Sequence, residues 1–276
     1  MTSTTRAGGP IAIIGLGCRY PDAKSPRELW ENVLARRQSF RPIPDERLPL
    51  EDYGDSDRTA LDKTYGQRAA VIDGFEFDWA RRRIPKQVFE QTDITHWLAL
   101  EVALQALTDA GYEPKSLPRD RTGVIIGNTL TGEQARAHVL RGRWPFVRKT
   151  IRAAGAKKGL DAATLEALVS ETEQIYKSFF PAPNEDTLAG SLANTIAGRV
   201  CNYMDLRGGG YTVDGACASS LLSVATAANA LCAGDIDVAL AGGVDVSLDA
   251  FELVGFARVG ALSDSEMKVY DRAGNG

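Results

Sequence analysis

The stretch VDGACASSL, from Val213 to Leu221, sets one cysteine among small residues, after a β-prone run and before a long apolar run. A strand that ends at Asp214–Gly215 and a helix that begins near Cys217 would place the sulfur at a helix N-terminus. The partial positive charge there favours a thiolate, and the free N–H groups of the first turn can hold a developing oxyanion. A lone cysteine is more often structural, but this setting favours a nucleophile.

The remaining cysteines and both histidines carry no comparable signal. Cys18 follows the first predicted strand, and Cys201 and Cys232 lie in helical patterns, so we interpret all three as structural. A cysteine acyl-transfer site usually needs a base or donor beside the sulfur. No motif places His96 or His138 there, and each is expected to be a surface or capping histidine. With no CxxC pair, neither a metal site nor a disulfide framework is predicted.

Glycine-rich and basic motifs elsewhere in the chain carry weaker signals. GLGCRY, after the first predicted strand, lacks the third glycine of a dinucleotide fingerprint, and RGGGY, at Arg207–Tyr211, lacks the Lys-Ser/Thr of a phosphate loop. RGRWPFVRK, at Arg141–Lys149, is a basic run with aromatics. It fits either a docking face for an acidic partner or, as such runs more commonly do, a solvated surface.

Composition limits the class of protein. The chain has 276 residues, ordinary apolar and charged content, and a net charge of -4, so neither nucleic acid nor a membrane surface is expected as a partner. No apolar run approaches the roughly 20 residues of a membrane span. The opening MTSTTRAGGP lacks the apolar core of a signal peptide, and residues 1–9 are expected to form a flexible tail. A reduced, cytoplasmic protein is the default.

The apolar patterns predict a layered α/β domain over residues 10–276. The expected order is β-α-β-α-β-α-β, with continuous apolar strands typical of a parallel-rich sheet. A helical insertion is expected at about 130–186, and the helix that starts at Cys217 is small or apolar all round, which predicts burial on every side. The expected strands are Pro10–Gly17, Thr122–Leu130, Gly208–Ala216 and Asp237–Ser247. The expected helices are 25–37 with Ser25 as N-cap, 93–110, 187–206 and one that starts at Cys217. The apolar face of the 93–110 helix is expected to carry Trp97, Leu100, Leu104 and Leu107. A long surface loop is expected at 43–66.

Several of these segments together resemble a known family. VDGACASSL resembles the nucleophile motif of β-ketoacyl synthases, which often reads V-D-T-A-C-S-S-S-L. Three longer segments resemble ketosynthase domains of multidomain polyketide synthases and occur in the same order as there. They are IAIIGLGCRYPDAKSPRELWENV, LANTIAGRVCNYMDLRGGGYTVDGACASSLLSV and ALAGGVDVSLDAFELVGFARVGALS. The resemblance covers nearly the whole chain. NTLTGE, RWPFVRKT and NEDTLAG look most like the iterative synthases that make enediyne polyenes, with polyunsaturated fatty-acid synthases as near relatives.

The resemblance implies a thiolase-like fold of α-β-α-β-α layers, built from two similar halves, and a homodimer. A second sheet would then cover the helix that starts at Cys217. It also implies an acyltransferase that performs decarboxylative Claisen condensation. Cys217 would take an acyl group from the phosphopantetheine arm of an acyl carrier protein, its backbone N–H would form part of the oxyanion hole, and the domain itself would bind no cofactor. The remaining domains of the synthase would be partners.

The chain also departs from the family pattern. Two further histidines, in H-G-T-G-T-like and N-x-G-H-like motifs, and a lysine between them belong to segments beyond YDRAGNG, where this sequence stops. The resemblance therefore implies the N-terminal part of a ketosynthase domain, truncated within the fold and expected to be inactive alone. Gly215 and Ala218 replace a threonine and a serine that are common in the family, and neither change removes the sulfur.

Three functions remain open on the sequence. The first is the nucleophile-bearing part of a polyketide or polyunsaturated fatty-acid ketosynthase. The second is a catalytically incomplete structural or dimerising fragment. The third is a thiolase-fold relative with another reaction, but Cys217 argues against a chain-length factor, and the GCRYPDAKSP opening argues against a thiolase or chalcone-type enzyme.

Overall fold

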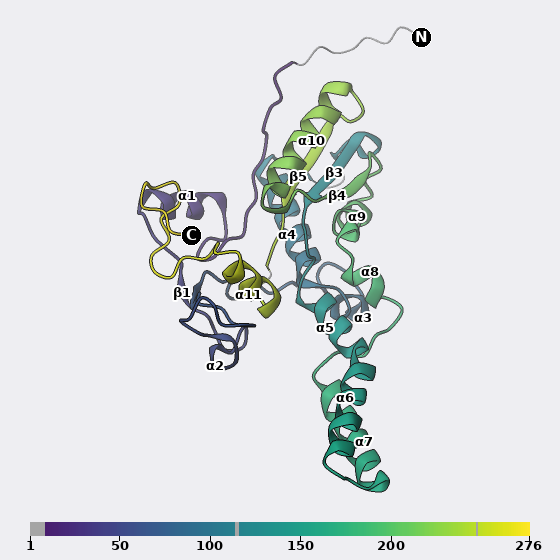
Figure 1. Cartoon of the computed structure of the whole chain (residues 1–276). Helices are drawn as coiled ribbons and strands as arrows, with labels where there is room; N and C mark the ends of the chain where they lie inside the picture. Colours follow the sequence, from purple (N-terminus) through teal and green to yellow (C-terminus); the bar gives the residue numbers. More distant parts are fainter. Residues whose placement is uncertain (1–8, 114–115, 247) are drawn as a thin grey trace.

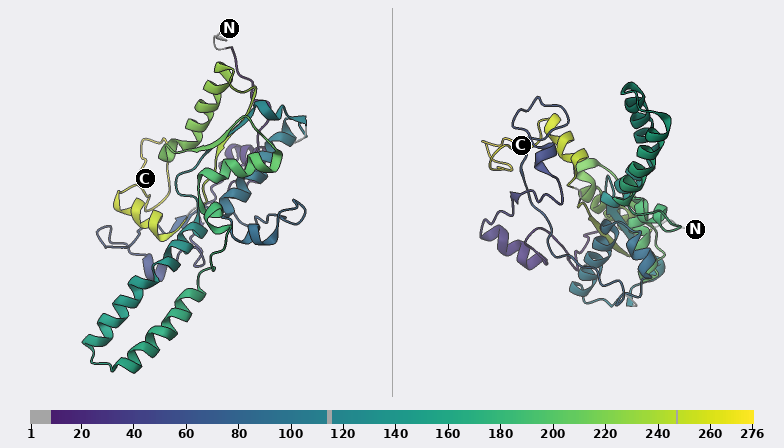
Figure 2. Two further views of the ribbon diagram at one scale, coloured as in Figure 1. Left: turned by 90° about the vertical axis from the view of Figure 1, so that its right-hand side faces the viewer. Right: turned by 90° about the horizontal axis from the view of Figure 1, so that it is seen from below.

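The computed structural model describes residues 9–113, 116–246 and 248–276 of the chain (Figure 1). The expected flexible tail falls, except for Gly9, outside the described residues, as does the last residue of the strand expected at 237–247. Within the described part, helices surround one small parallel sheet, and a helical arm projects away from it (Figure 2).

The sheet has three parallel strands in the order β4-β3-β5. The central strand β3 (Thr122–Gly127) pairs with β4 (Gly210–Val213) on one side and with β5 (Val238–Gly243) on the other. Every residue of β3 is buried, as expected for a continuous apolar run in a parallel sheet covered on both faces. Because the strands are parallel, their carboxyl ends lie at one edge, where Gly127 pairs with both neighbours.

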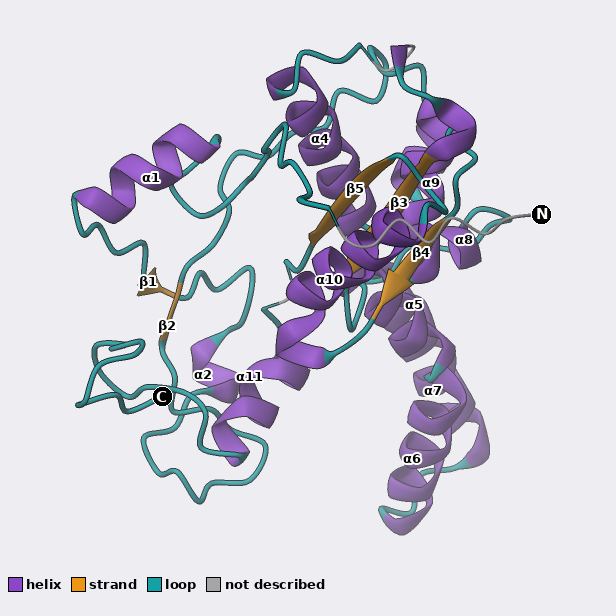
Figure 3. Cartoon of the chain, turned by 90° about the horizontal axis from the view of Figure 1, so that it is seen from above, coloured by secondary structure: helices purple, strands orange, loops and turns teal. Residues whose placement is uncertain are grey.

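Helices cover the two faces of this sheet (Figure 3). Val124 and Ile126 of β3 join the main core with α4 (Ile94–Asp109) and α9 (Asn194–Met204). Gly127, which alternates with them, faces the start of α10 (Ser219–Ala233) on the other side. Successive side chains of a strand point to opposite faces. Thus α4 and α9 lie on one face of the sheet and α10 on the other.

The predicted helix at 93–110 is confirmed as α4. The Asp93 carboxylate caps it by accepting a hydrogen bond from the Thr95 N–H, which satisfies one free donor of the first turn. The face predicted to be apolar is buried along its whole length, at Trp97, Leu100, Leu104 and Leu107. Gly111, with φ of +73°, ends the helix in the left-handed conformation that glycine adopts without strain.

The predicted helix from Cys217 is confirmed in position, but the prediction that it is buried on every side is wrong. Only Ser219, Ser223 and Ala227 are buried along α10, whereas Leu221 is 74% exposed and Val224 is 49% exposed. The sheet covers one face of the helix, and no described element covers the other. The apolar composition of α10 therefore exceeds what this chain buries.

The same segment bears on the expectation about membrane spans. Residues Ala216–Ala233 have a mean hydropathy of 1.5 and, by length and composition alone, could cross a membrane. This contradicts the expectation that no apolar run approaches that length. Interior helices of folded domains share these properties, and one face of α10 packs on the strands β3 and β5.

The strand predicted at Pro10–Gly17 does not form. The segment runs beside α4, and the Leu16 N–H donates to the Asp109 carboxylate at 2.8 Å instead of to a neighbouring strand. Gly15 and Gly17 allow this approach, because a Cβ atom at Gly15 would lie 2.2 Å from the Ala106 carbonyl oxygen. The apolar side chains of the run remain exposed, Ile13 by 81%. The apolar pattern is real, but the segment does not pair with the outer strands β4 and β5, each of which has a neighbouring strand on one side only.

The region between the opening segment and α4 carries short elements. These are α1 (Pro26–Leu34), β1 (Arg41–Pro42), α2 (Leu50–Tyr53), β2 (Arg68–Ala69) and α3 (Lys86–Glu90). The predicted cap is confirmed, since the Ser25 hydroxyl accepts from the Glu28 N–H. The long surface loop expected at 43–66 is only partly confirmed. Ile43 and Leu48 are buried in a second small core with Leu253 of α11 (Ala250–Arg258).

The segment in which a helical insertion was predicted contains α5 (Glu133–Gly142), α6 (Trp144–Lys157) and α7 (Ala162–Ser178). Figure 1 shows α6 and α7 side by side as an arm that projects from the sheet. The single helix predicted at 187–206 is wrong in one respect. It breaks at Leu192, whose backbone is extended, into α8 (Thr187–Ser191) and α9.

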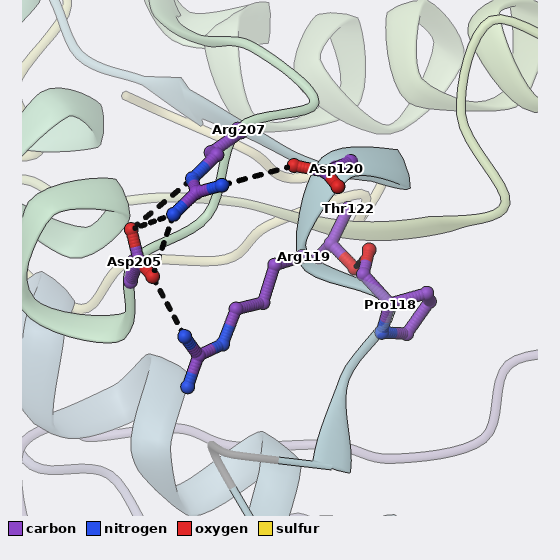
Figure 4. Close-up of polar contacts among 6 residues, drawn as sticks. All are labelled: Pro118, Arg119, Asp120, Thr122, Asp205 and Arg207. Carbon is purple, nitrogen blue, oxygen red and sulfur yellow. Dashed lines mark hydrogen bonds and ion pairs between the residues drawn. The ribbon is translucent and has the colours of Figure 1, made fainter.

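Ion pairs tie together the amino end of the sheet (Figure 4). The Asp205 carboxylate, just after α9, receives Arg119 at 2.7 Å and Arg207 at 3.2 Å. Arg207 also lies 3.5 Å from Asp120 in the turn η2 (Arg119–Arg121) that precedes β3. These exposed pairs are individually weak, but together they join the entries to β3 and β4 on the edge opposite to Cys217.

Candidate active site

The candidate nucleophile lies between the end of β4 and the start of α10. After Val213 the chain turns at Asp214 and Gly215, passes through one 3₁₀ turn η3 (Ala216–Ala218), and enters α10 at Ser219. Cys217 therefore sits at the carboxyl edge of the sheet, where open parallel sheets place their ligands. Its side chain is exposed, whereas the three other cysteines are half-buried.

The turn before Cys217 holds a strained residue. Ala216 has a φ of +51°, a left-handed conformation that costs a non-glycine residue free energy. Asp214 holds it there: one carboxylate oxygen accepts from the Ala216 N–H at 2.8 Å and from the Thr129 hydroxyl at 2.9 Å. These bonds, that of Ala216 first, lower the pKa of Asp214. The turn is thus tied to the segment that leaves β3.

Ser219 fixes the other side of the same turn. Its hydroxyl accepts from the Gly215 N–H at 3.0 Å and donates to the Ala216 carbonyl at 2.6 Å. One turn further along α10, the Ser223 hydroxyl donates to the Gly242 carbonyl of β5 at 2.8 Å. The serines after the cysteine therefore have definite roles, since they anchor the turn and the helix to the sheet.

Two glycines let the helix start reach the edge of the sheet. A Cβ atom at Gly127 would lie 2.4 Å from the carbonyl carbon of Ser219, and one at Gly243 would lie 2.7 Å from the Cβ of Ser220. Any side chain at these positions would push α10 away from β3 and β5. The small residues of the motif and the glycines at the strand ends therefore form one close contact that sets the position of Cys217.

Polar residues directly after β3 complete this edge, and sequence reasoning missed them. The Asn128 amide donates to the Val244 carbonyl at 2.8 Å, and its oxygen accepts from the Thr131 N–H at 2.8 Å. Asn128 thus connects the segments that follow β3 and β5. Thr129 bonds to Asp214, which follows β4. The signal that could have revealed them is their place, since Asn and Thr directly follow a buried apolar strand.

His96 does not belong to this site. It lies on α4, on the opposite face of the sheet from α10, and it is fully buried, so the expectation of a surface or capping histidine is wrong. Its Nδ1 accepts from Arg199 Nε at 3.4 Å, and the Arg199 guanidinium lies 4.7 Å from the Trp97 ring centre. Burial first, and then the charge of Arg199, lower the pKa of His96 to about 3.

His138 is also apart from Cys217. It is half-buried on α5 at the base of the arm, beside a small pocket lined with Arg141, Lys177 and Pro183. Burial lowers its pKa. The structure therefore brings neither histidine to the candidate nucleophile.

The structural role predicted for the other cysteines agrees with their surroundings. Burial raises the pKa of Cys18 and of Cys201, which disfavours the reactive thiolate. Across the described residues, no cluster of His, Cys, Asp or Glu has the arrangement of a metal site.

A pocket in the described part of the chain lies away from the turn. It has a volume of about 340 Å³ between the opening segment, the 74–82 loop and α4. Its lining carries both signs of charge, including the ion pair of Arg82 with Glu101 at 2.7 Å. Neither Cys217 nor its turn contributes to it, so it gives no support for an acyl-binding cavity.

Comparison with known proteins identifies the family of the chain. The family described as "Beta-ketoacyl synthase, N-terminal domain" matches residues 9–276. A polyunsaturated fatty acid synthase polypeptide from Thraustochytrium is 29% identical over 96% of this chain. The polyketide synthase ThaG of Burkholderia thailandensis is 31% identical over 99% of it.

Solved structures agree with these relatives. The ketosynthase domain OzmH KS7 of oxazolomycin synthesis in Streptomyces albus aligns with a TM-score of 0.69 at 26% identity, over 91% of this chain. A ketosynthase from module 6 of the bacillaene synthase of Bacillus subtilis aligns with a TM-score of 0.64 at 25% identity, over 92% of this chain.

The matched portion of each relative is small. This chain spans 37% and 35% of those two ketosynthase structures, and 9% and 4% of the fatty-acid and polyketide synthases. The resemblance to ketosynthases and the thiolase-like α/β fold are both confirmed over residues 9–276. The chain belongs to the β-ketoacyl synthase family and corresponds to its N-terminal domain.

Proposed function

We propose that this chain supplies the nucleophile of a ketosynthase that extends carrier-bound acyl chains. The observation that carries the proposal is the position of Cys217. It is the exposed cysteine of the chain, it follows a strained turn held by Asp214 and Ser219, and it directly precedes α10 at the carboxyl edge of the sheet. This is the geometry of an accessible nucleophile beside first-turn N–H groups.

The first half-reaction transfers the acyl group. The Cys217 thiolate attacks the carbonyl carbon of an acyl-phosphopantetheine thioester, and the carbonyl oxygen becomes an oxyanion. The backbone N–H of Cys217 donates to that oxyanion. The tetrahedral intermediate then collapses, the pantetheine thiolate leaves, and an acyl-Cys217 thioester remains.

The second half-reaction forms the carbon–carbon bond. A malonyl thioester on a carrier loses carbon dioxide, and the electron pair of the broken bond forms an enolate. The enolate carbon attacks the acyl carbonyl, and the Cys217 thiolate leaves, so that a β-ketoacyl thioester is carried on the phosphopantetheine. The domain needs no bound cofactor for either step, because the carrier's prosthetic arm holds the substrates.

We also propose that this chain alone does not complete the condensation. Decarboxylation produces a charged enolate, which needs donors or cations to stabilise it. His96 is buried on the far face of the sheet, and His138 lies at the base of the arm. The remaining catalytic groups would come from the rest of a longer synthase, which would act as a homodimer in the cytoplasm.

The relatives support the ketosynthase class but do not distinguish its subtypes. Both a polyunsaturated fatty-acid synthase and polyketide synthases match over nearly the whole chain, and the two classes share the condensation chemistry. An iterative polyketide synthase of the enediyne polyene type is the subtype that we propose, on the NTLTGE, RWPFVRKT and NEDTLAG segments. A polyunsaturated fatty-acid synthase is the alternative.

A structural fragment is the second candidate function. The exposed apolar face of α10, with Leu221 and Val224, favours it because such faces mark sites of association. In this case the chain would contribute a surface for assembly but no chemistry.

Acyl loading tests the proposal. The chain and the complete synthase are incubated with an acyl-pantetheine thioester, then examined by intact mass and peptide mapping. We expect one acyl group on the peptide that contains Cys217, in at least the complete synthase, and its loss in Cys217→Ala. Cys232→Ala is the matched control and retains loading. Absence of loading at Cys217 in both proteins would refute the nucleophile and leave the structural role.

A further inference from the structure

The arm has an uneven charge distribution. Between Gln134 and Leu160 the sequence contains no Asp or Glu, although the chain as a whole has a net charge of -4. The cations of this stretch that lie on or beside α6 are Arg141, Arg143, Arg148, Lys149, Arg152, Lys157 and Lys158. Helix α6 is therefore a local concentration of positive charge on an acidic protein.

Part of this charge is used inside the arm. Arg152 makes a two-pronged ion pair with Glu166 of α7, at 2.8 and 3.0 Å. Arg141 donates to the carbonyl oxygens of Lys177 and Phe180. Arg148 is half-buried, and its charge acts on Glu166. These three side chains hold α6 against the neighbouring segment and are not available to a partner.

The remaining cations share one side of the helix. Arg143 precedes α6, and Phe146, Lys149 and Lys157 lie on it, all exposed and roughly opposite to the buried Trp144 and Gly155. The Arg143 guanidinium lies 5.4 Å from the Phe146 ring centre, and Phe146 is 61% exposed. In the described part of the chain, no ion pair involves any of these three cations. We define Arg143, Phe146, Lys149 and Lys157 as the α6 outer face.

The arm starts at the same edge of the sheet as the candidate nucleophile. The chain leaves the carboxyl end of β3, where Thr129 bonds to Asp214, and enters α5 at Glu133. A helix of ten residues covers about 15 Å, and α6 follows directly. A macromolecule bound at the α6 outer face would therefore be held on the arm that leaves this edge of the sheet, with α5 between α6 and the edge that presents Cys217 (Figure 1).

We propose that the α6 outer face is the docking surface for an acidic carrier protein that delivers the acyl group to Cys217. The proposal rests on the proposed function. Three exposed cations attract an acidic partner over long range and raise the rate of encounter. The exposed Phe146 adds the aromatic contact that is common at the centre of protein interfaces.

A second copy of the arm is a poorer occupant by charge. On α7, Glu166 is paired with Arg152, and Glu173 is paired with Lys177. Among the described residues of α7, this leaves Glu171 as the acidic side chain outside an ion pair. One carboxylate does not complement three cations, so pairing of two arms would leave positive charge unmatched.

Charge reversal tests the surface in the complete synthase. We compare Arg143→Glu/Lys149→Glu/Lys157→Glu with wild type, using as acyl donors the acyl-carrier protein and a free acyl-pantetheine thioester. We expect loading of Cys217 from the carrier to slow about tenfold or more and to lose its salt dependence. Loading from the free thioester stays as in wild type, because no docking is needed. Lys268→Glu/Arg272→Glu, at exposed cations of the C-terminal segment, is the control and retains both rates.

The outcomes separate this inference from the proposed function. Loading from the carrier at the wild-type rate in the triple variant overturns the docking surface, while loading at Cys217 preserves the function. Failure of both donors with the wild-type protein overturns the function itself. If the triple variant fails to fold, Lys149→Gln/Lys157→Gln gives the same test, because it removes two positive charges instead of reversing three. Loss of binding to anionic lipid vesicles, with carrier loading unchanged, would assign the surface to a membrane and also overturn the proposal.

Discussion

At the scale of single residues, Asp214 determines how Cys217 is presented. The carboxylate holds Ala216 in its strained conformation and connects it to Thr129. Removing it in Asp214→Ala leaves the turn free to relax, because the left-handed conformation is not favoured by alanine itself. We therefore expect several-fold slower alkylation of Cys217 by iodoacetamide and slower acyl loading, with the fold retained.

The conservative variant separates positioning from charge. Asp214→Asn keeps an acceptor oxygen for the Ala216 N–H and should retain most of the loading rate. Equal losses in Asp214→Asn and Asp214→Ala would show that the charge matters and would contradict a positioning role. Peptide mass mapping of the alkylated Cys217 measures both.

The buried His96 predicts a pH dependence of stability. Its pKa is about 3 in the folded protein, below the ordinary value of about 6.5 that applies to the unfolded chain. Below pH 6.5 the unfolded chain therefore binds more protons, so stability falls as pH falls, by up to roughly 1.4 kcal/mol per pH unit until about pH 3. Above pH 6.5 both states are neutral, and this contribution is constant.

Replacement of the ring tests that sign. In His96→Leu we expect a shallower fall of the free energy of unfolding between pH 6.5 and 4, measured by urea denaturation in the complete synthase or in this chain. His138→Leu is the comparison, since His138 is only half-buried. An unchanged pH slope in His96→Leu would show that another group dominates the acid sensitivity.

At the scale of elements, the contact between β3 and α10 positions the site. Gly127→Ala would place a methyl group 2.4 Å from the Ser219 backbone. Backbone cannot yield as a flexible side chain does, so we expect about 1–3 kcal/mol of destabilisation and a displaced Cys217. The control is Gly142→Ala, where a Cβ atom meets nothing within 4 Å. The unfolding temperature and the rate of acyl loading should both fall in Gly127→Ala, and neither should fall in Gly142→Ala.

The sequence pattern predicts elements where the chain's own residues determine them. The apolar face of α4 and the continuous run of β3 bury themselves within this chain, and both predictions are confirmed. The strand predicted at 10–17 is wrong because this segment bonds to α4 at Asp109 instead of to an outer strand. Full burial of α10 depends on a covering element that no described residue supplies. The turn at Cys217 was predicted from small residues, but its clamp by Asp214 and Thr129 was not, because that contact joins segments 85 residues apart.

At the scale of the whole molecule, apolar surface exceeds what the described elements cover. Leu221 and Val224 on α10 and Ile13 in the opening segment are all substantially exposed. The resemblance to ketosynthases implies a second sheet layer over the helix that follows the nucleophile. We therefore expect this chain alone to self-associate through α10, as large apolar faces do in water.

Polar substitution of that face has opposite effects in two settings. In the chain alone, Leu221→Gln/Val224→Gln should reduce self-association measured by size-exclusion chromatography with light scattering, because less apolar area then faces water. In the complete synthase the same pair should lower the unfolding temperature, because two amides would enter a covered apolar layer without partners. Leu61→Gln, at an isolated leucine that is 75% exposed, should change neither. If the pair leaves the complete synthase as stable as wild type, this face of α10 is solvent-exposed there too, and its apolar composition serves an external partner instead of the interior of the domain.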